Sequence, residues 1–89
     1  MSELTSLRNI GTEMARKLQS IDINTAEDLI VVGSKEAFFR LKMRYPNICL
    51  VFLYVLQGAI DNVDYNRLSE ETKADLKEFN KQFKKQNSI

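Results

Sequence analysis

Few side chains in this sequence are of types suited to catalysis. The chain of 89 residues has no histidine, which excludes an imidazole general base and a histidine metal ligand. Its single cysteine, Cys49, excludes an intrachain disulfide and a paired-thiol zinc site. Cys49 lies within the apolar run of residues 48–56, so we expect a buried and unreactive thiol.

Two aspartates, Asp61 and Asp64, are three positions apart near the end of an expected helix. Paired carboxylates can carry acid–base chemistry or hold a metal ion, but no set of metal-ligand residues surrounds this pair. Capping and solvation are the better interpretation. The sequence therefore predicts a non-enzymatic protein with no cofactor, no metal and no small-molecule ligand.

The most informative pattern is a tight turn between two short helical segments near the N-terminus. Asn9 and Gly11 both tolerate the left-handed backbone of such a turn, and the small Ala15 lets helices approach closely. Unpaired backbone amides at the start of the second helix favour an anion such as a DNA phosphate. Contacts of this kind carry no base specificity. The candidate nucleic-acid-binding residues are Asn9, Ile10, Gly11, Thr12, Arg16 and Lys17.

An alternative is that this turn only packs two helices together. The usual hairpin of this type is Pro-Gly-Ile-Gly, whereas Arg8 and Asn9 stand at its first two positions here. Glu13 lies in the first turn of the second helix, where its charge repels a phosphate. Lysines and arginines number 13 and acidic residues 12, so the net charge of +1 does not indicate a nucleic-acid binder.

Two further basic patterns have two interpretations each. Lysines repeat at helical spacing along the last helix, and Arg40 and Arg44 are four positions apart. Each pattern is either a phosphate track or an ordinary solvated helix face. The lysine stripe consists of Lys73, Lys77, Lys81 and Lys84, with Lys85 beside it.

The spacing of apolar residues predicts an all-α fold, a small orthogonal bundle of five or six short helices in one domain over residues 1–89. The expected helices cover residues 4–7, 12–20, 25–33, 34–45, 48–62 and 69–86. Thr25 is the expected N-cap of the third helix, with Asp28 completing a capping box. Ser34 and Asn47 are the expected caps of the next two.

The expected helix over residues 48–62 is apolar nearly all round, which predicts a buried central helix. Either the other helices cover it completely, or an uncovered strip serves a homodimer or another partner. Its nine-residue apolar run is much shorter than the roughly 20 residues of a membrane span. The N-terminus has no secretory signal pattern, so we expect a cytoplasmic protein with no membrane contact.

One set of residues, spread along nearly the whole chain, carries a family resemblance. Its members are Leu7-Arg8-Asn9-Ile10-Gly11, Ala15, Leu18, Ile23-Asn24-Thr25-Ala26-Glu27-Asp28-Leu29, Gly33, Glu36-Ala37-Phe38, Leu41, Cys49-Leu50, Leu53-Tyr54, Leu56, Gly58-Ala59 and Leu68. With these residues the chain resembles the TfoX (Sxy) C-terminal domain family over about residues 4–79. The resemblance implies a helical domain with a helix-hairpin-helix-like start that regulates natural competence and DNA-uptake gene expression. In some bacteria such regulators act with the cyclic-AMP receptor protein.

Two departures from the family pattern matter. The usual regulator has another domain before this one, so the sequence is expected to be either a stand-alone member or a fragment. Asp22 stands where the family favours glycine, and aspartate tolerates the left-handed conformation, so the fold should survive. The alternative function is a protein-interaction module that docks on a transcription regulator or self-associates without touching DNA.

Overall fold

The structure, a computed structural model, describes the backbone of residues 3–87 and the side chains of residues 3–82. The all-α prediction is confirmed over this part of the chain, where an isolated β-bridge joins Glu3 to Thr25. Five α-helices and two 3-10 turns follow one another there. They are η1 (Leu4–Ser6), α1 (Thr12–Gln19), α2 (Ala26–Val32), α3 (Ser34–Arg44), α4 (Leu50–Asp61), η2 (Tyr65–Arg67) and α5 (Glu70–Asn87).

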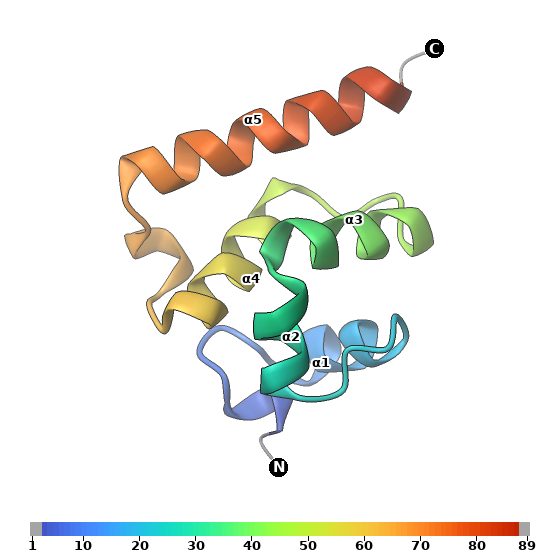
Figure 1. The fold of residues 1–89 in the computed structure, drawn as a ribbon, viewed down its shortest axis with the longest axis vertical. Coiled ribbons are helices and arrows are strands. Elements are labelled where there is room, and N and C mark those ends of the chain that lie inside the picture. The colour runs from blue at the N-terminus through green and yellow to red at the C-terminus, as the bar shows by residue number, and fades with distance from the viewer. Residues whose placement is uncertain (1–2, 88–89) are drawn as a thin grey trace.

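The helices are arranged around α4, which contacts α3, η2 and α5 (Figure 1). Figure 1 shows α5 along one side of the molecule, while α1 and α2 lie toward the other side. The molecule measures 41 × 28 × 20 Å along its principal axes. None of the described helices is long and apolar enough to cross a membrane.

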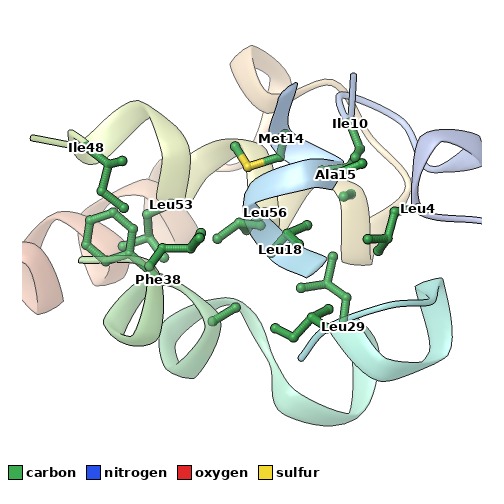
Figure 2. Packing of buried hydrophobic residues seen from close by; sticks show 14 of the residues in the cluster. Leu4, Ile10, Met14, Ala15, Leu18, Leu29, Phe38, Ile48, Leu53 and Leu56 are labelled. Atoms are coloured by element: carbon green, nitrogen blue, oxygen red, sulfur yellow. The ribbon is translucent and has the colours of Figure 1, made fainter. Parts of the chain in front are cut away.

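Buried apolar side chains from every α-helix belong to one core. Figure 2 shows how those of α1 to α4 pack together. The prediction of a buried central helix is partly confirmed, because Leu53 and Leu56 of α4 are fully buried whereas Val51 is 39% exposed. The most exposed of the large apolar side chains lie on α2 and α3 instead. Val31 is 84% exposed and Met43 is 69% exposed.

The N-terminus of α2 is built as the sequence predicts. Thr25 Oγ1 accepts a hydrogen bond from the Asp28 amide at 3.1 Å, and Asp28 Oδ2 accepts one from the Asn24 amide at 3.1 Å. The return bond of the capping box therefore goes to the residue before the cap. Gly33, with φ of 88°, ends the helix as expected.

Two predicted caps are wrong. Ser34 is the first residue of α3 rather than its cap, and its hydroxyl donates to Gln57 Oε1 of α4 at 2.5 Å. Asn47 does not cap α4, which begins at Leu50 with Cys49 in the cap position. The reason is a turn before the helix, in which the Ile48 amide donates a hydrogen bond to the Tyr45 carbonyl at 3.1 Å. Because of this turn, the helix starts later in the chain than predicted.

The prediction of a buried Cys49 is also wrong, because its side chain is exposed. The neighbouring Ile48 is only 5% exposed and belongs to the core, whereas the next residue, Cys49, points to solvent. Cys49 has an extended backbone, with φ of −117° and ψ of 175°, and successive side chains of extended backbone point in opposite directions. The sequence pattern of the run does not show this local change from helix to extended chain.

Candidate nucleic-acid interface

The predicted hairpin lies between η1 and α1, and its first helix is a single 3-10 turn. Asn9 has φ of 73°, which confirms the predicted left-handed turn residue, and the Ile10 amide donates to the Leu7 carbonyl at 3.3 Å. Gly11 has an extended backbone, with φ of −93°. The turn therefore depends on the tolerance of asparagine for positive φ, and not on that of glycine.

Two of the six candidate residues have side chains that face the protein. Ile10 is 5% exposed and belongs to the core. Asn9 is half-buried, and its Nδ2 donates to the Val63 carbonyl at 2.9 Å, which ties the hairpin to the loop after α4. The side chains of Asn9 and Ile10 therefore position the hairpin, and neither side chain faces a ligand.

Gly58 of α4 is a residue of this site that the sequence predicted only as part of the family pattern. A Cβ atom at Gly58 would lie 2.5 Å from Asn9 Nδ2 and 2.7 Å from the Val63 carbonyl oxygen. Glycine at this position therefore permits the contact between α4 and the hairpin. A glycine inside a strongly apolar helix was the signal that could have indicated such a close approach.

The exposed part of the hairpin is the start of α1. Gly11 and Thr12 are exposed, and no side chain within the described part of the chain caps the first amides of the helix. The first hydrogen bond of the helix runs from the Ala15 amide to the Gly11 carbonyl at 3.0 Å. The preceding amides have no partner within the helix, and the helix dipole adds positive potential at this end.

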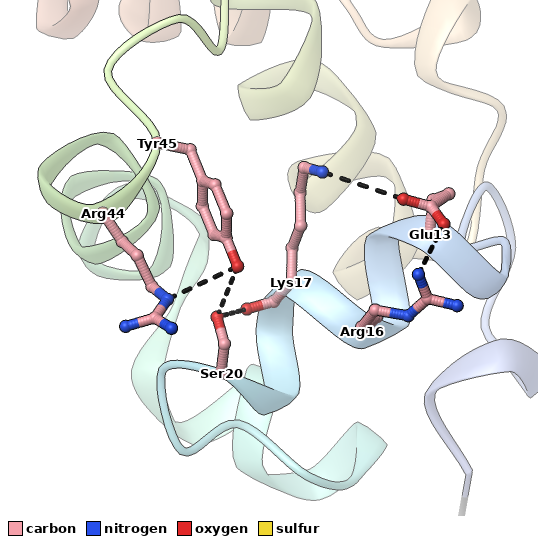
Figure 3. A network of polar contacts seen from close by, with 6 residues as sticks. All are labelled: Glu13, Arg16, Lys17, Ser20, Arg44 and Tyr45. Carbon is pink, nitrogen blue, oxygen red and sulfur yellow. Dashed lines mark hydrogen bonds and ion pairs between the residues drawn. The ribbon is translucent and has the colours of Figure 1, made fainter.

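Glu13 reduces the positive charge at this helix start (Figure 3). Its carboxylate lies 3.0 Å from Arg16 Nη1 and 3.9 Å from Lys17 Nζ. Arg16 is 70% exposed and Lys17 is 26% exposed, so Arg16 is the more accessible cation. Glu13 therefore opposes phosphate binding in two ways. Its charge repels a phosphate, and its carboxylate pairs with both predicted cations.

Lys17 also belongs to a second polar cluster at the other end of α1, drawn in the same view (Figure 3). The Ser20 hydroxyl donates to the Lys17 carbonyl at 2.6 Å and lies 3.0 Å from the Tyr45 hydroxyl. Arg44 Nε donates to the same Tyr45 oxygen at 3.4 Å. The pKa of Tyr45 is lowered below its ordinary value of 10.0, first by its side-chain hydrogen bond with Ser20 and then by the one with Arg44.

The other basic patterns fit an ordinary solvated face better than a phosphate track. Glu70 and Glu78 line the same shallow groove as Lys73, Lys77 and Lys81 of α5. The side chains of Lys84 and Lys85 lie outside the described residues. Arg40 pairs with Glu36 at 3.0 Å, so the pair as a whole has no net charge. Charges of both signs on one face weaken the positive potential that a phosphate backbone would meet there.

The two aspartates considered for acid–base chemistry have separate partners. Asp61 accepts a hydrogen bond from Gln57 Nε2 at 3.0 Å, and Asp64 lies 3.4 Å from Arg8 Nη1. Among residues 3–82, no group of three metal-ligating side chains is placed to hold a metal ion. This geometry agrees with the interpretation of Asp61 and Asp64 as surface carboxylates.

Comparison with known proteins gives a matching family and similar crystal structures. The family model described as the TfoX C-terminal domain matches residues 1–80. An uncharacterized protein from Listeria monocytogenes, in a triclinic crystal, is 35% identical with a TM-score of 0.91, over 93% of this chain and 94% of that chain. A protein of unknown function from the same organism, in a tetragonal crystal, is 37% identical with a TM-score of 0.86, over 89% of this chain and 98% of that one. No curated protein matches.

Proposed function

The chain belongs to the TfoX C-terminal domain family, and from this premise we propose a non-enzymatic regulatory domain of bacterial DNA uptake that contacts DNA phosphates through the start of α1. The domain acts in the cytoplasm, and its DNA contact is weak and independent of base sequence. One observation carries the proposal of DNA contact. Gly11 and Thr12 are exposed at a helix start whose first amides have no side-chain cap in the described structure.

The division of roles within the hairpin supports this proposal. Asn9 and Ile10 fix the turn against the protein, while Gly11 and Thr12 present backbone to solvent. Arg16 lies on the same short helix and is mostly exposed, so it adds charge near a bound phosphate. Because Glu13 offsets part of this charge, we expect affinity to be low and to fall with salt.

The experiment is fluorescence anisotropy of a labelled random DNA duplex, titrated with the protein at low and moderate salt. The test variant is Gly11→Val. A Cβ atom at Gly11 meets no other atom within 4 Å, and its backbone is extended, so the variant keeps the fold. We expect a loss of affinity of about tenfold, because the valine side chain would keep a phosphate away from the amides at the start of α1, and one hydrogen bond to a charged group contributes about 1.5 kcal/mol.

The control is Ala74→Val, which also places a valine at an exposed position, here on α5. It should bind DNA as the unchanged protein does. Equal affinity of the Gly11→Val protein and the control would show that the hairpin is not the DNA site. Absence of binding by the unchanged protein even at low salt would remove direct DNA contact altogether.

A second candidate function is protein docking without DNA contact, either on a transcription regulator such as the cyclic-AMP receptor protein or on a second copy. The observation that favours it is the exposure of apolar side chains on α2 and α3. Ile30 is 54% exposed, Val31 is 84% exposed and Met43 is 69% exposed. Exposed apolar side chains gathered on neighbouring elements are typical of interaction surfaces.

A further inference from the structure

A groove of about 350 Å³ lies where the end of α1, the end of α3 and the start of α4 meet. Apolar atoms of Pro46, Ile48 and Phe52 line it together with the ring of Tyr45. Lys17 and Arg44 are the charged residues in its lining. The groove thus combines apolar side chains with two cations in its lining, and the hairpin is at the opposite end of α1.

The two cations flank the Tyr45 ring. Lys17 Nζ lies 5.0 Å from the ring centroid and Arg44 Cζ lies 5.8 Å from it, and Figure 3 shows them on opposite sides of the ring. Within the described residues, no carboxylate forms an ion pair with Arg44, whereas Glu13 lies 3.9 Å from Lys17. Lys42 Nζ donates to the Ile48 carbonyl at 2.6 Å and adds a third positive charge nearby.

Hydrogen bonds hold the groove in shape. The Ser20 hydroxyl lies 2.6 Å from the Lys17 carbonyl and 3.0 Å from the Tyr45 hydroxyl, and so links the end of α1 to Tyr45. The Tyr45 backbone is fixed as well, because its amide donates to the Leu41 carbonyl at 2.6 Å. A preformed groove loses little conformational freedom when a ligand binds.

We propose that this groove binds an acidic segment of a partner protein, with an apolar side chain of the segment on the apolar part of the lining and carboxylates on Arg44 and Lys17. Charge complementarity identifies the occupant, since the excess of cations in the lining requires anions. The apolar part of the lining favours a peptide over a DNA backbone, because phosphates and sugars gain little from apolar contact. Stacking of a base on Tyr45 is opposed by the cations on both sides of the ring.

This proposal does not depend on DNA binding by the hairpin. Lys17 belongs to both sets of residues, so the test uses Arg44 instead. The probe is a short dye-labelled peptide in which aspartates alternate with leucine and phenylalanine, and binding is measured by fluorescence anisotropy. One control peptide has asparagine in place of every aspartate, and another has serine in place of every leucine and phenylalanine.

The expected result is binding of the first peptide and a loss of at least about fivefold with each control peptide. Arg44→Gln should weaken binding by about fivefold, and Arg44→Lys should restore most of it because the charge returns. The matched control is Arg40→Gln, on the same helix four residues earlier, where the guanidinium already pairs with Glu36. This control should bind the peptide as the unchanged protein does.

Nuclear magnetic resonance locates the peptide on the protein. Backbone amide signals of Arg44, Tyr45 and Ile48 should shift on titration, while those of Gly11 and Thr12 stay in place. Equal binding of the asparagine peptide, or shifts confined to α2, would overturn the proposal. Shifts of the groove amides with duplex DNA and none with the peptide would also overturn it, in favour of a nucleic acid. The Gly11→Val measurement tests the hairpin separately, so each proposal can fail alone.

Discussion

At the start of α1, the carboxylate of Glu13 reduces the positive charge of the hairpin. The Glu13 carboxylate lies 3.0 Å from Arg16 and 3.9 Å from Lys17. Glu13 also occupies the first turn of α1, where a negative charge interacts favourably with the helix dipole. The same residue therefore stabilises the helix and opposes an anionic ligand. The side chains of Glu13 and Arg16 are mostly exposed, so the ion pairs of Glu13 add little to the stability of the fold.

The substitution Glu13→Gln tests this conflict. It removes the repulsive charge and releases Arg16 and Lys17, so we expect DNA affinity to rise about threefold and the salt dependence to become steeper. The measurement is the same anisotropy titration at two salt concentrations. Glu71→Gln, at an exposed position in the first turn of α5, makes the same change in net charge far from the hairpin. If both variants bind alike, total charge and not the hairpin governs binding.

Because Gly58 has no side chain, α4 can pack closely against the hairpin. We expect Gly58→Ala to lower the free energy of unfolding by about 1–2 kcal/mol, because overpacking outweighs the gain in helix propensity. The Cβ atom would meet the Val63 carbonyl oxygen at 2.7 Å, and a backbone atom cannot turn away as a side chain can. Urea unfolding measures the change.

The control for this prediction is Gly11→Ala, whose Cβ atom meets open space. Its stability should fall by only about 0.5 kcal/mol, because alanine is a weaker N-cap than glycine but meets no clash. A Gly58→Ala protein as stable as this control would show that α4 and the hairpin can separate at little cost.

Among the helices, α2 depends most on its ends. It has seven residues, too few to be stable alone, and the capping bonds of Thr25 and Asp28 satisfy two amides at its start. Only Ala26 and Leu29 of this helix are buried, whereas Ile30 and Val31 face solvent. Packing thus contributes less to α2 than to α4, and the cap contributes more.

We expect Thr25→Ala to destabilise the protein by about 1 kcal/mol, because the Asp28 amide loses its acceptor. Hydrogen exchange should become faster at the amides of α2 first. Thr5→Ala, at an exposed position of η1, is the matched control and should leave both exchange and stability unchanged. Uniform destabilisation without faster exchange in α2 would contradict the idea that the cap acts locally.

For the molecule as a whole, the exposed apolar side chains of α2 and α3 predict self-association at high concentration. Substitution of the most exposed one, Val31→Asp, should shift sedimentation toward the monomer without loss of stability, because Val31 is 84% exposed. Val51→Asp is the control at a 39% exposed position of α4. A monomeric unchanged protein at every concentration would exclude a homodimer and leave docking on a different protein.

The sequence by itself determined the features that depend on neighbours within one helical turn. The cap at Thr25, the stop at Gly33 and the left-handed residues Asn9 and Asp22, with φ of 73° and 68°, all agree with prediction. Each of these follows from backbone sterics or from a hydrogen bond spanning three or four residues. The order of the helices and the all-α class follow from apolar spacing in the same way.

Only the tertiary structure decided which side chains reach solvent or meet a distant partner. Asn9 bonds to Val63, 54 positions away, and Tyr45 joins Ser20 across 25 positions. The exposure of Cys49 likewise depends on a turn that delays α4. Such contacts arise from the packing of whole helices, which local spacing does not specify. The hairpin could therefore be located from the sequence, but the groove beside Tyr45 could not.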